Sequence, residues 1–291
     1  MIALRRPPEG RTRLAWHELE QIQTNEWVLK LRPPYYGAVF ADREPDLAAK
    51  SPAGFHIART GAVAWAVFRG LTPRDLARIN DFAGAYRRFV LLGDNPNLKG
   101  QFSDELDGCL ALDYNFAESR SRSYTEIGEL VYHAKYRRSV AAAEELGRRL
   151  AEAAGRVPTM RCVSRPCLSY VPPGPHKRFD LPRILARLLV DYGWCTMPLR
   201  EFEPLVHPEL SLAKPDFKRL TIDEKIRAWT RLLARGVRLS GNVAGAAVYV
   251  IDDLYQSGAT LWSYARYLKA AGAAAVFGLV CEKSRGDRDN R

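Results

Sequence analysis

The sequence predicts an α/β protein whose C-terminal part contains a parallel sheet flanked by helices. Apolar residues over 246–251 and over 275–280 are typical of buried strands, and a helical pattern over 260–271 lies between them. A strand, a helix and a strand in this order form a parallel pair with a crossover helix. Ligands of such sheets bind beyond the carboxyl ends of the strands. The residues that follow position 251 are therefore the first candidates for a functional site.

The elements upstream of this unit follow from their patterns and end signals. Thr221 and Glu224 have the spacing of a capping box, which starts a helix that Gly236 ends. Amphipathic spacing and short apolar runs predict the remaining elements of this part. They are helices from Tyr124, over 139–154 and over 182–189, and a strand over 167–171.

The N-terminal part is predicted to be an α+β accessory domain of unknown role over residues 1–110, followed by the α/β domain over 111–291. Thr72 and Pro73 start a helix that extends to about Arg88. The other predicted elements are a polar helix over 16–31, strands over 35–40, 55–68 and 89–92, and a turn over 93–97. This part contains no chemical motif.

The composition is that of a soluble globular protein, with 47% hydrophobic and 26% charged residues among 291. No apolar run reaches the length of about eighteen residues that a membrane span needs. The first residues have too short an apolar run for a signal peptide, so we expect a cytoplasmic protein without a membrane partner. The five cysteines are scattered and form no CxxC pair, which favours free thiols over a zinc site.

The chain is basic, with a formal net charge of +11. A basic surface attracts anionic partners such as phosphorylated metabolites or nucleic acid. The basic residues are spread along the chain and form no single block. Charge therefore indicates the sign of a partner and does not identify a function.

The chemical signal lies directly after the first apolar run, where Asp252 and Asp253 precede a short loop of small residues. Carboxylates accept hydrogen bonds from hydroxyl groups, and free N–H groups of a loop and a helix N-terminus bind phosphate. Together they predict a sugar-phosphate site. A GxxxxGK[ST] loop is absent and Gly258 lacks the partners of a GxGxxG motif. Too few residues follow Asp253 to complete a phospho-receiver domain. The alternative is structural, with Asp253 capping a turn and Asp252 solvated.

The stretch over 248–260, VYVIDDLYQSGAT, resembles the signature of the type I phosphoribosyltransferases, which bind 5-phosphoribosyl 1-diphosphate (PRPP). The resemblance is closest to the ComF-like branch, named after a competence protein, because Tyr255 follows the acids and their apolar neighbour. It covers roughly residues 115–285. The upstream segments that resemble the family come in its order: 124–140, 169–179 and 214–221.

The resemblance implies transfer of phosphoribose from PRPP to a nitrogen nucleophile, with release of diphosphate and with Mg²⁺ bound together with PRPP. Asp252 and Asp253 would be the catalytic residues, accepting the ribose hydroxyls and favouring an oxocarbenium-like transition state. No protein residue is assigned as a direct metal ligand. The 5-phosphate loop would comprise Tyr255, Gln256, Ser257, Gly258, Ala259 and Thr260. The diphosphate would face Pro173, Gly174, Lys177 and Arg178, a flap would carry Lys214, Lys218 and Arg219, and His176 is a candidate general base.

The chain departs from the family pattern in ways that leave catalysis open. Gln256 and Ser257 stand where the family loop usually has two threonines, and Arg178 stands where a glycine is usual. The alternative is a catalytically inactive protein that senses PRPP or nucleotides, or a nucleic-acid-associated protein of competence or phage-defence type. The expected partners are PRPP or another ribose 5-phosphate ligand, with nucleic acid as the alternative and a homodimer as the expected assembly.

Overall fold

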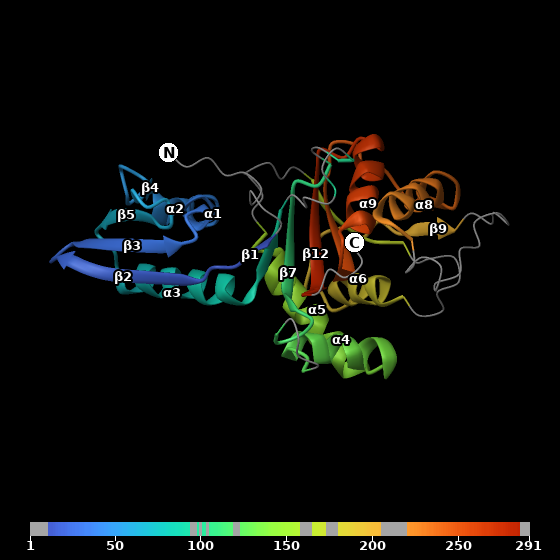
Figure 1. Cartoon of the computed structure of the whole chain (residues 1–291), viewed down its shortest axis with the longest axis horizontal. Helices are drawn as coiled ribbons and strands as arrows, with labels where there is room; N and C mark the ends of the chain where they lie inside the picture. The colour runs from blue at the N-terminus through green and yellow to red at the C-terminus, as the bar shows by residue number, and fades with distance from the viewer. Residues whose placement is uncertain are drawn as a thin grey trace. The chain divides into compact units, whose positions relative to one another are not determined.

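The computed structural model describes residues 11–93, 98, 101–102, 105–118, 123–157, 165–172, 180–204 and 220–285. The chain divides into two compact units, one formed by 1–93 with 158–161 and the other by 94–157 with 162–291 (Figure 1). Residues 94–110 thus group with the second unit, and the predicted functional division at residue 110 stays a prediction. None of the described helices combines the length and apolar character that crossing a membrane requires.

The first unit is built on an antiparallel sheet with the strand order β2-β3-β5-β4. Phe40, Phe68 and Phe82 pack edge to face, which joins two helices and one strand in the core. The elements of this unit are β1 (Arg11–Thr12), β2 (Trp16–Gln23), β3 (Glu26–Arg32), α1 (Tyr35–Arg43), α2 (Pro45–Ala48), β4 (His56–Ile57), β5 (Ala64–Arg69), α3 (Pro73–Arg88) and β6 (Val90–Leu92). The short strands β1 and β6 pair antiparallel and do not belong to this four-stranded sheet.

Two predictions for this unit were wrong. The expected helix over 16–31 is the hairpin β2–β3, in which buried Leu29 and Leu31 alternate with Lys30 at the period of a strand. The expected strand over 35–40 is the start of α1, where Tyr36, Val39 and Phe40 have helical spacing and are fully buried. In both segments burial in the core decided the structure over local propensity.

The other predictions for the described residues of this unit are confirmed in full or in part. Helix α3 is confirmed, and Thr72 forms a complete capping box with Asp75 at its start. The expected strand over 89–92 is confirmed as β6. The strand expected over 55–68 is two strands, β4 and β5, separated by a turn. Most of the predicted turn over 93–97 lies outside the described residues.

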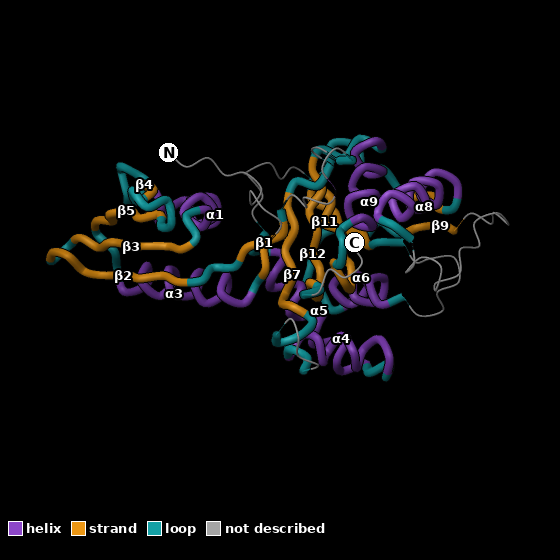
Figure 2. The backbone as a smooth tube through the Cα atoms, viewed as in Figure 1, coloured by secondary structure: helices purple, strands orange, loops and turns teal. Residues whose placement is uncertain are grey.

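The second unit contains the predicted parallel sheet, with neighbouring strands in the order β7-β12-β11-β8. Figure 2 labels the first three of these strands. The strands are β7 (Gly108–Tyr114), β8 (Pro166–Tyr170), β11 (Ala247–Tyr255) and β12 (Ala275–Lys283). Its helices are α4 (Glu126–Tyr136), α5 (Val140–Ala154), α6 (Leu181–Asp191), α8 (Ile222–Arg235) and α9 (Ala259–Ala270). A two-stranded ladder of β9 (Phe202–Pro204) and β10 (Val237–Leu239) completes it. The α/β class and the helices predicted in this part are confirmed, whereas β7, β9 and β10 were not predicted.

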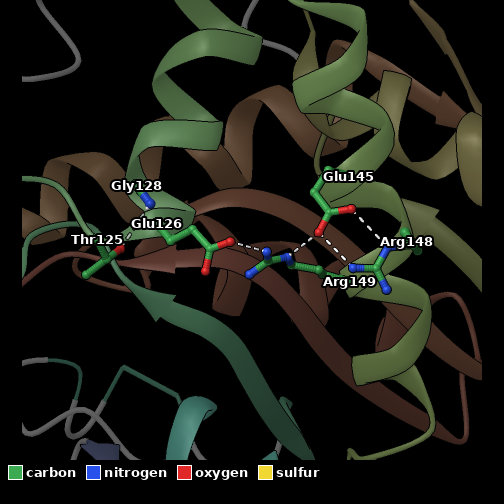
Figure 3. A network of polar contacts seen from close by, with 6 residues as sticks. All are labelled: Thr125, Glu126, Gly128, Glu145, Arg148 and Arg149. Atoms are coloured by element: carbon green, nitrogen blue, oxygen red, sulfur yellow. Dashed lines mark hydrogen bonds and ion pairs between the residues drawn. The ribbon is translucent and has the colours of Figure 1, made fainter.

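Helices α4 and α5 are joined by a network of polar contacts (Figure 3). Thr125 caps α4 by accepting the N–H of Gly128 at 3.0 Å. Arg149 of α5 contacts Glu126 of α4 and also binds Glu145 at 2.7 Å. These contacts are partly exposed and contribute little energy each, but they orient the start of α4. Its other end carries a residue of the candidate site.

Candidate functional site

Asp252 and Asp253 lie at the carboxyl end of β11, which has parallel neighbours on both sides. The strand continues to Tyr255, beyond the expected end at Ile251, so both acids belong to the strand itself. Each is only 7% exposed. The Asp252 carboxylate accepts the backbone N–H of Asp253 at 2.8 Å. Asp252 is therefore not the solvated group of the structural alternative.

The loop after the strand is short and leads directly into α9. Gly258 adopts a left-handed conformation, with φ of 83°, and is the N-cap of this helix. A β-carbon at Gly258 would lie 2.3 Å from the Tyr255 hydroxyl oxygen, so only glycine fits here. The first N–H groups of an α-helix have no partner within it, and the helix dipole adds positive potential there. This terminus begins five residues after the second carboxylate.

The side chains of the loop have two different surroundings. Ser257 and Ala259 are buried, whereas Gln256 and Thr260 are partly accessible. The Ser257 hydroxyl accepts the N–H of Ala259 at 3.4 Å. Tyr255 is 4% exposed and its hydroxyl accepts the indole N–H of Trp262 at 3.1 Å. The Tyr255 side chain thus packs between the loop and α9.

A cation from another part of the chain reaches the acid pair. Lys135, in the last turn of α4, places its Nζ 2.5 Å from Oδ2 of Asp253. Burial lowers the pKa of Lys135, but the negative groups around it, Asp253 foremost, together raise it by more, so the net pKa is above its ordinary value. Lys135 therefore stays charged and partly neutralises the buried carboxylates.

Two ionisable residues, Glu282 and Lys283, end the neighbouring strand β12. Glu282 is 8% exposed, and its Oε2 has no hydrogen-bond partner among the described residues. Burial and the Asp253 charge raise the pKa of Glu282 to about 8, so its carboxyl is mostly protonated at neutral pH. Lys283 donates to the carbonyl of Gln256 at 3.0 Å and to that of Ser284 at 2.8 Å. The ammonium of Lys283 thus holds the loop through the carbonyl of Gln256.

Sequence reasoning did not find Lys135, Glu282 or Lys283. The last two carry the same signal as the acid pair, because Glu282 and Lys283 follow the apolar run of a buried parallel strand. Extending the rule about strand ends to β12 would have found them. Lys135 has no such signal, since it lies in a helix that is distant in sequence from Asp253.

The other predicted site residues lie outside the described part of the chain. This holds for the diphosphate residues Pro173, Gly174, Lys177 and Arg178, for His176, and for the flap residues Lys214, Lys218 and Arg219. The strand that precedes the diphosphate segment is described. β8 pairs with β11, and the N–H of Val171 donates to the carbonyl of Ile251 at 2.9 Å.

Metal ligation and thiol chemistry have little support from the described residues. Within these ranges no group of three or more His, Cys, Asp and Glu side chains could hold a metal ion. The described cysteines are free thiols, and three of them are buried. Burial raises the pKa of Cys109 and Cys281, which keeps these thiols protonated.

Strand order, acid pair and helix terminus together define an α/β protein with a candidate ligand site at the carboxyl edge of a parallel sheet. No family model and no curated protein matches the chain. Among solved structures, a hypoxanthine phosphoribosyltransferase from Staphylococcus aureus is 10% identical with a TM-score of 0.29, over 50% of this chain and 66% of that chain.

Two further solved structures are similar at the same level. The hypoxanthine-guanine phosphoribosyltransferase of L. donovani is 17% identical with a TM-score of 0.28, over 48% of this chain and 65% of that chain. An allosteric regulatory enzyme of purine biosynthesis is 12% identical with a TM-score of 0.33, over 88% of this chain and 45% of that chain. The chain thus spans about two thirds of the first two proteins. Similarity this weak carries no conclusion about what the chain binds.

Proposed function

We propose that this chain binds PRPP, or another ribose 5-phosphate, and transfers the phosphoribosyl group to a nitrogen nucleophile with release of diphosphate. One observation carries the proposal. Two buried carboxylates, Asp252 and Asp253, lie near the carboxyl end of a parallel strand. The N-terminus of the next helix, with Gly258 as its N-cap, follows a few residues later. Acceptors for hydroxyl groups and donors for a phosphate therefore lie within one short segment.

The carboxylates are proposed to bind the ribose. Ionised carboxylates accept hydrogen bonds through both oxygens, and the ribose 2- and 3-hydroxyls are neighbouring donors. Loss of diphosphate from C1 leaves positive charge on the ring, which nearby negative charge stabilises. Because Asp252 and Asp253 are largely shielded from water, their charges act more strongly than at an exposed surface.

The loop and the start of α9 are proposed to bind the 5-phosphate. Backbone N–H groups at a helix N-terminus and in a turn with a left-handed glycine are suited to an anion. The hydroxyls of Ser257 and Thr260 are further donors on the same segment. Lys283, which holds the Gln256 carbonyl, adds positive charge behind the loop. Gln256 stands in the loop as a half-buried side chain whose amide offers both a donor and acceptors.

Magnesium is proposed to enter with the diphosphate of PRPP. Mg²⁺ favours oxygen ligands and retains several waters, and carboxylates such as Asp252 and Asp253 suit contacts to those waters. Two carboxylates are too few for a complete protein cage, so we assign no direct protein ligand. When bound, the ion would neutralise charge on the leaving diphosphate.

The diphosphate is proposed to face the segment that follows β8. This segment contains Lys177 and Arg178, whose cationic groups suit phosphate oxygens. The pairing of β8 with β11 supports the proposal, since the segment begins next to the strand that carries the acids. Lys214, Lys218 and Arg219 are proposed as a flap from the sequence alone.

Calorimetry with PRPP and Mg²⁺ tests the proposal. The wild-type chain should bind PRPP, and the double variant Asp252→Asn/Asp253→Asn should bind it at least tenfold more weakly, about 1.4 kcal/mol or more. Asp107→Asn is the matched control, because Asp107 is a carboxylate of the same unit in an ion pair with Lys269 at 2.8 Å. Absence of binding by the wild-type chain would contradict the proposal.

A second assay separates an enzyme from a sensor. Release of diphosphate is measured with a panel of purine and pyrimidine bases and other amines. Release that depends on one acceptor supports transfer and identifies the nucleophile. Tight PRPP binding without release for any acceptor would assign the chain to the sensing alternative.

A further inference from the structure

The acid pair is held by two different parts of the protein. The Asp252 carboxylate is held within β11, by the N–H of the next residue at 2.8 Å. The Asp253 carboxylate is held from outside the strand, by Lys135 of α4 at 2.5 Å. The Asp253 side chain is 9% exposed and the Lys135 side chain is 18% exposed. The ion pair therefore lies mostly out of water.

The charges around the pair explain why a cation is needed there. Two adjacent carboxylates repel each other, and burial strengthens the repulsion. A lysine in the last turn of a helix is favoured by the helix dipole, which is negative at that end. Lys135 places a positive charge beside the acid pair and lies in the last turn of α4. The other end of α4 is oriented by the cap at Thr125 and by the contacts to α5.

The ion pair leaves the carboxylate able to bind a ligand. A carboxylate has about four acceptor positions on its two oxygens, and one ammonium group does not occupy them all. An ion pair that is largely shielded from water is stronger than an exposed one, so it favours one direction of the carboxylate. The ion pair with Lys135 thus restrains the direction in which the Asp253 carboxylate points.

We propose that Lys135 is a positioning residue of the ribose-binding site, acting through Asp253; this inference rests on the proposed function. Helix α4 is then part of the ligand site although it contributes no group to the phosphate loop. Lys135 sets the direction of one of the two carboxylates. The phosphate-binding part, formed by the loop and the N-terminus of α9, does not depend on it.

Two ligands distinguish positioning of the ribose from a general effect. The full chain is titrated calorimetrically with ribose 5-phosphate and, separately, with inorganic phosphate. Lys135→Met removes the ammonium but keeps the length of the side chain. We expect it to weaken ribose 5-phosphate binding on the order of tenfold or more, and phosphate binding by less than about threefold.

Two further variants serve as rescue and control. Lys135→Arg retains the charge and should recover most of the affinity for ribose 5-phosphate. Lys269→Met breaks a similar pair, Lys269 with Asp107 at 2.8 Å, in the same unit. It should leave both affinities near the wild-type values. Equal losses for both ligands in Lys135→Met, or no loss for ribose 5-phosphate, would overturn the inference.

A third variant covers the case in which Lys135→Met does not fold. Lys135→Gln keeps a neutral donor and should show the same selective loss for ribose 5-phosphate, and unchanged affinity in this variant would overturn the inference. Failure of the proposed function looks different, because the wild-type chain would then bind neither ribose 5-phosphate nor PRPP. Wild-type binding with unaffected Lys135 variants refutes only the positioning role.

Discussion

The hydroxyl of Tyr255 lies directly against Gly258, so that a β-carbon on the glycine would come within 2.3 Å of it. The same hydroxyl accepts the indole N–H of Trp262 at 3.1 Å, which ties the end of β11 to α9. The loop between strand and helix can therefore follow this path only with glycine at position 258. Two effects exclude a side chain at this position: the left-handed backbone of Gly258 and its close contact with the Tyr255 hydroxyl.

Gly258→Ala should reduce both stability and ligand binding. Left-handed strain and the clash with Tyr255 together should cost about 2–4 kcal/mol of unfolding free energy. Binding of PRPP should fall below detection, because the loop must move to admit the methyl group. Urea unfolding and calorimetry measure the two effects.

Gly193→Ala is the matched control, since Gly193 has a φ of 65° and no atom within 4 Å of the added β-carbon. It carries the backbone strain without a clash and should cost about 1–2 kcal/mol. PRPP binding should be unchanged. Similar losses of binding in the two variants would refute the role assigned to the contact between Tyr255 and Gly258.

Glu282→Gln should change how stability depends on pH. The pKa of Glu282 is raised from 4.5 to about 8 in the folded protein. Between these two values the folded state holds a proton that the unfolded chain has lost. Raising the pH through this window therefore lowers the stability of the wild type, by at most about 1.4 kcal/mol per pH unit. Above about pH 8 both states are ionised and the loss stops.

The measurement is urea unfolding of wild type and Glu282→Gln at several pH values from about 5 to about 9. The stability of the wild type relative to the variant should fall with rising pH and become constant above about pH 8. Glu129→Gln, at an exposed position on α4, controls for the loss of one carboxyl and should not reproduce this dependence. A relative stability that is constant, or that rises with pH, would contradict the burial of Glu282 beside Asp253.

Lys283→Met should loosen the loop without breaking the sheet. Lys283 is 4% exposed and holds the carbonyls of Gln256 and Ser284. Methionine retains the apolar stem but removes these hydrogen bonds, whose loss should cost about 1–3 kcal/mol of unfolding free energy. Inorganic phosphate and ribose 5-phosphate should both bind more weakly, because the loop that holds the phosphate loses its brace.

Comparison with Lys135→Met makes the Lys283 prediction specific. The Lys283 variant should affect both ligands, whereas the Lys135 variant should affect ribose 5-phosphate selectively. Hydrogen exchange of the amides over 255–260 gives an independent measurement and should speed up in Lys283→Met. Unchanged exchange and unchanged phosphate binding would show that Lys283 does not support the loop.

Local signals were sufficient for much of the second unit. The capping box of Thr221 with Glu224 formed as predicted, and the alternation of apolar runs and helical pattern produced the parallel pair β11–β12. These predictions rest on neighbours within a few residues, which is the range over which caps and periodicity act. The helix expected over 16–31 was wrong, because its buried residues Leu29 and Leu31 alternate at the period of a strand and lie in β3, which pairs with β2 and β5.

The sequence by itself determined the candidate site as a segment, because Asp252, Asp253 and Gly258 are close neighbours in the chain and their chemistry is local. Only the tertiary structure brought Lys135 and Glu282 near Asp253 and Lys283 to the carbonyl of Gln256. A buried ionisable group either has a partner of opposite charge or is neutralised, and that partner can come from any element that packs against it. In this protein the partners are supplied by α4 and β12, whose contacts with the acid pair and its loop exist only after the sheet has formed.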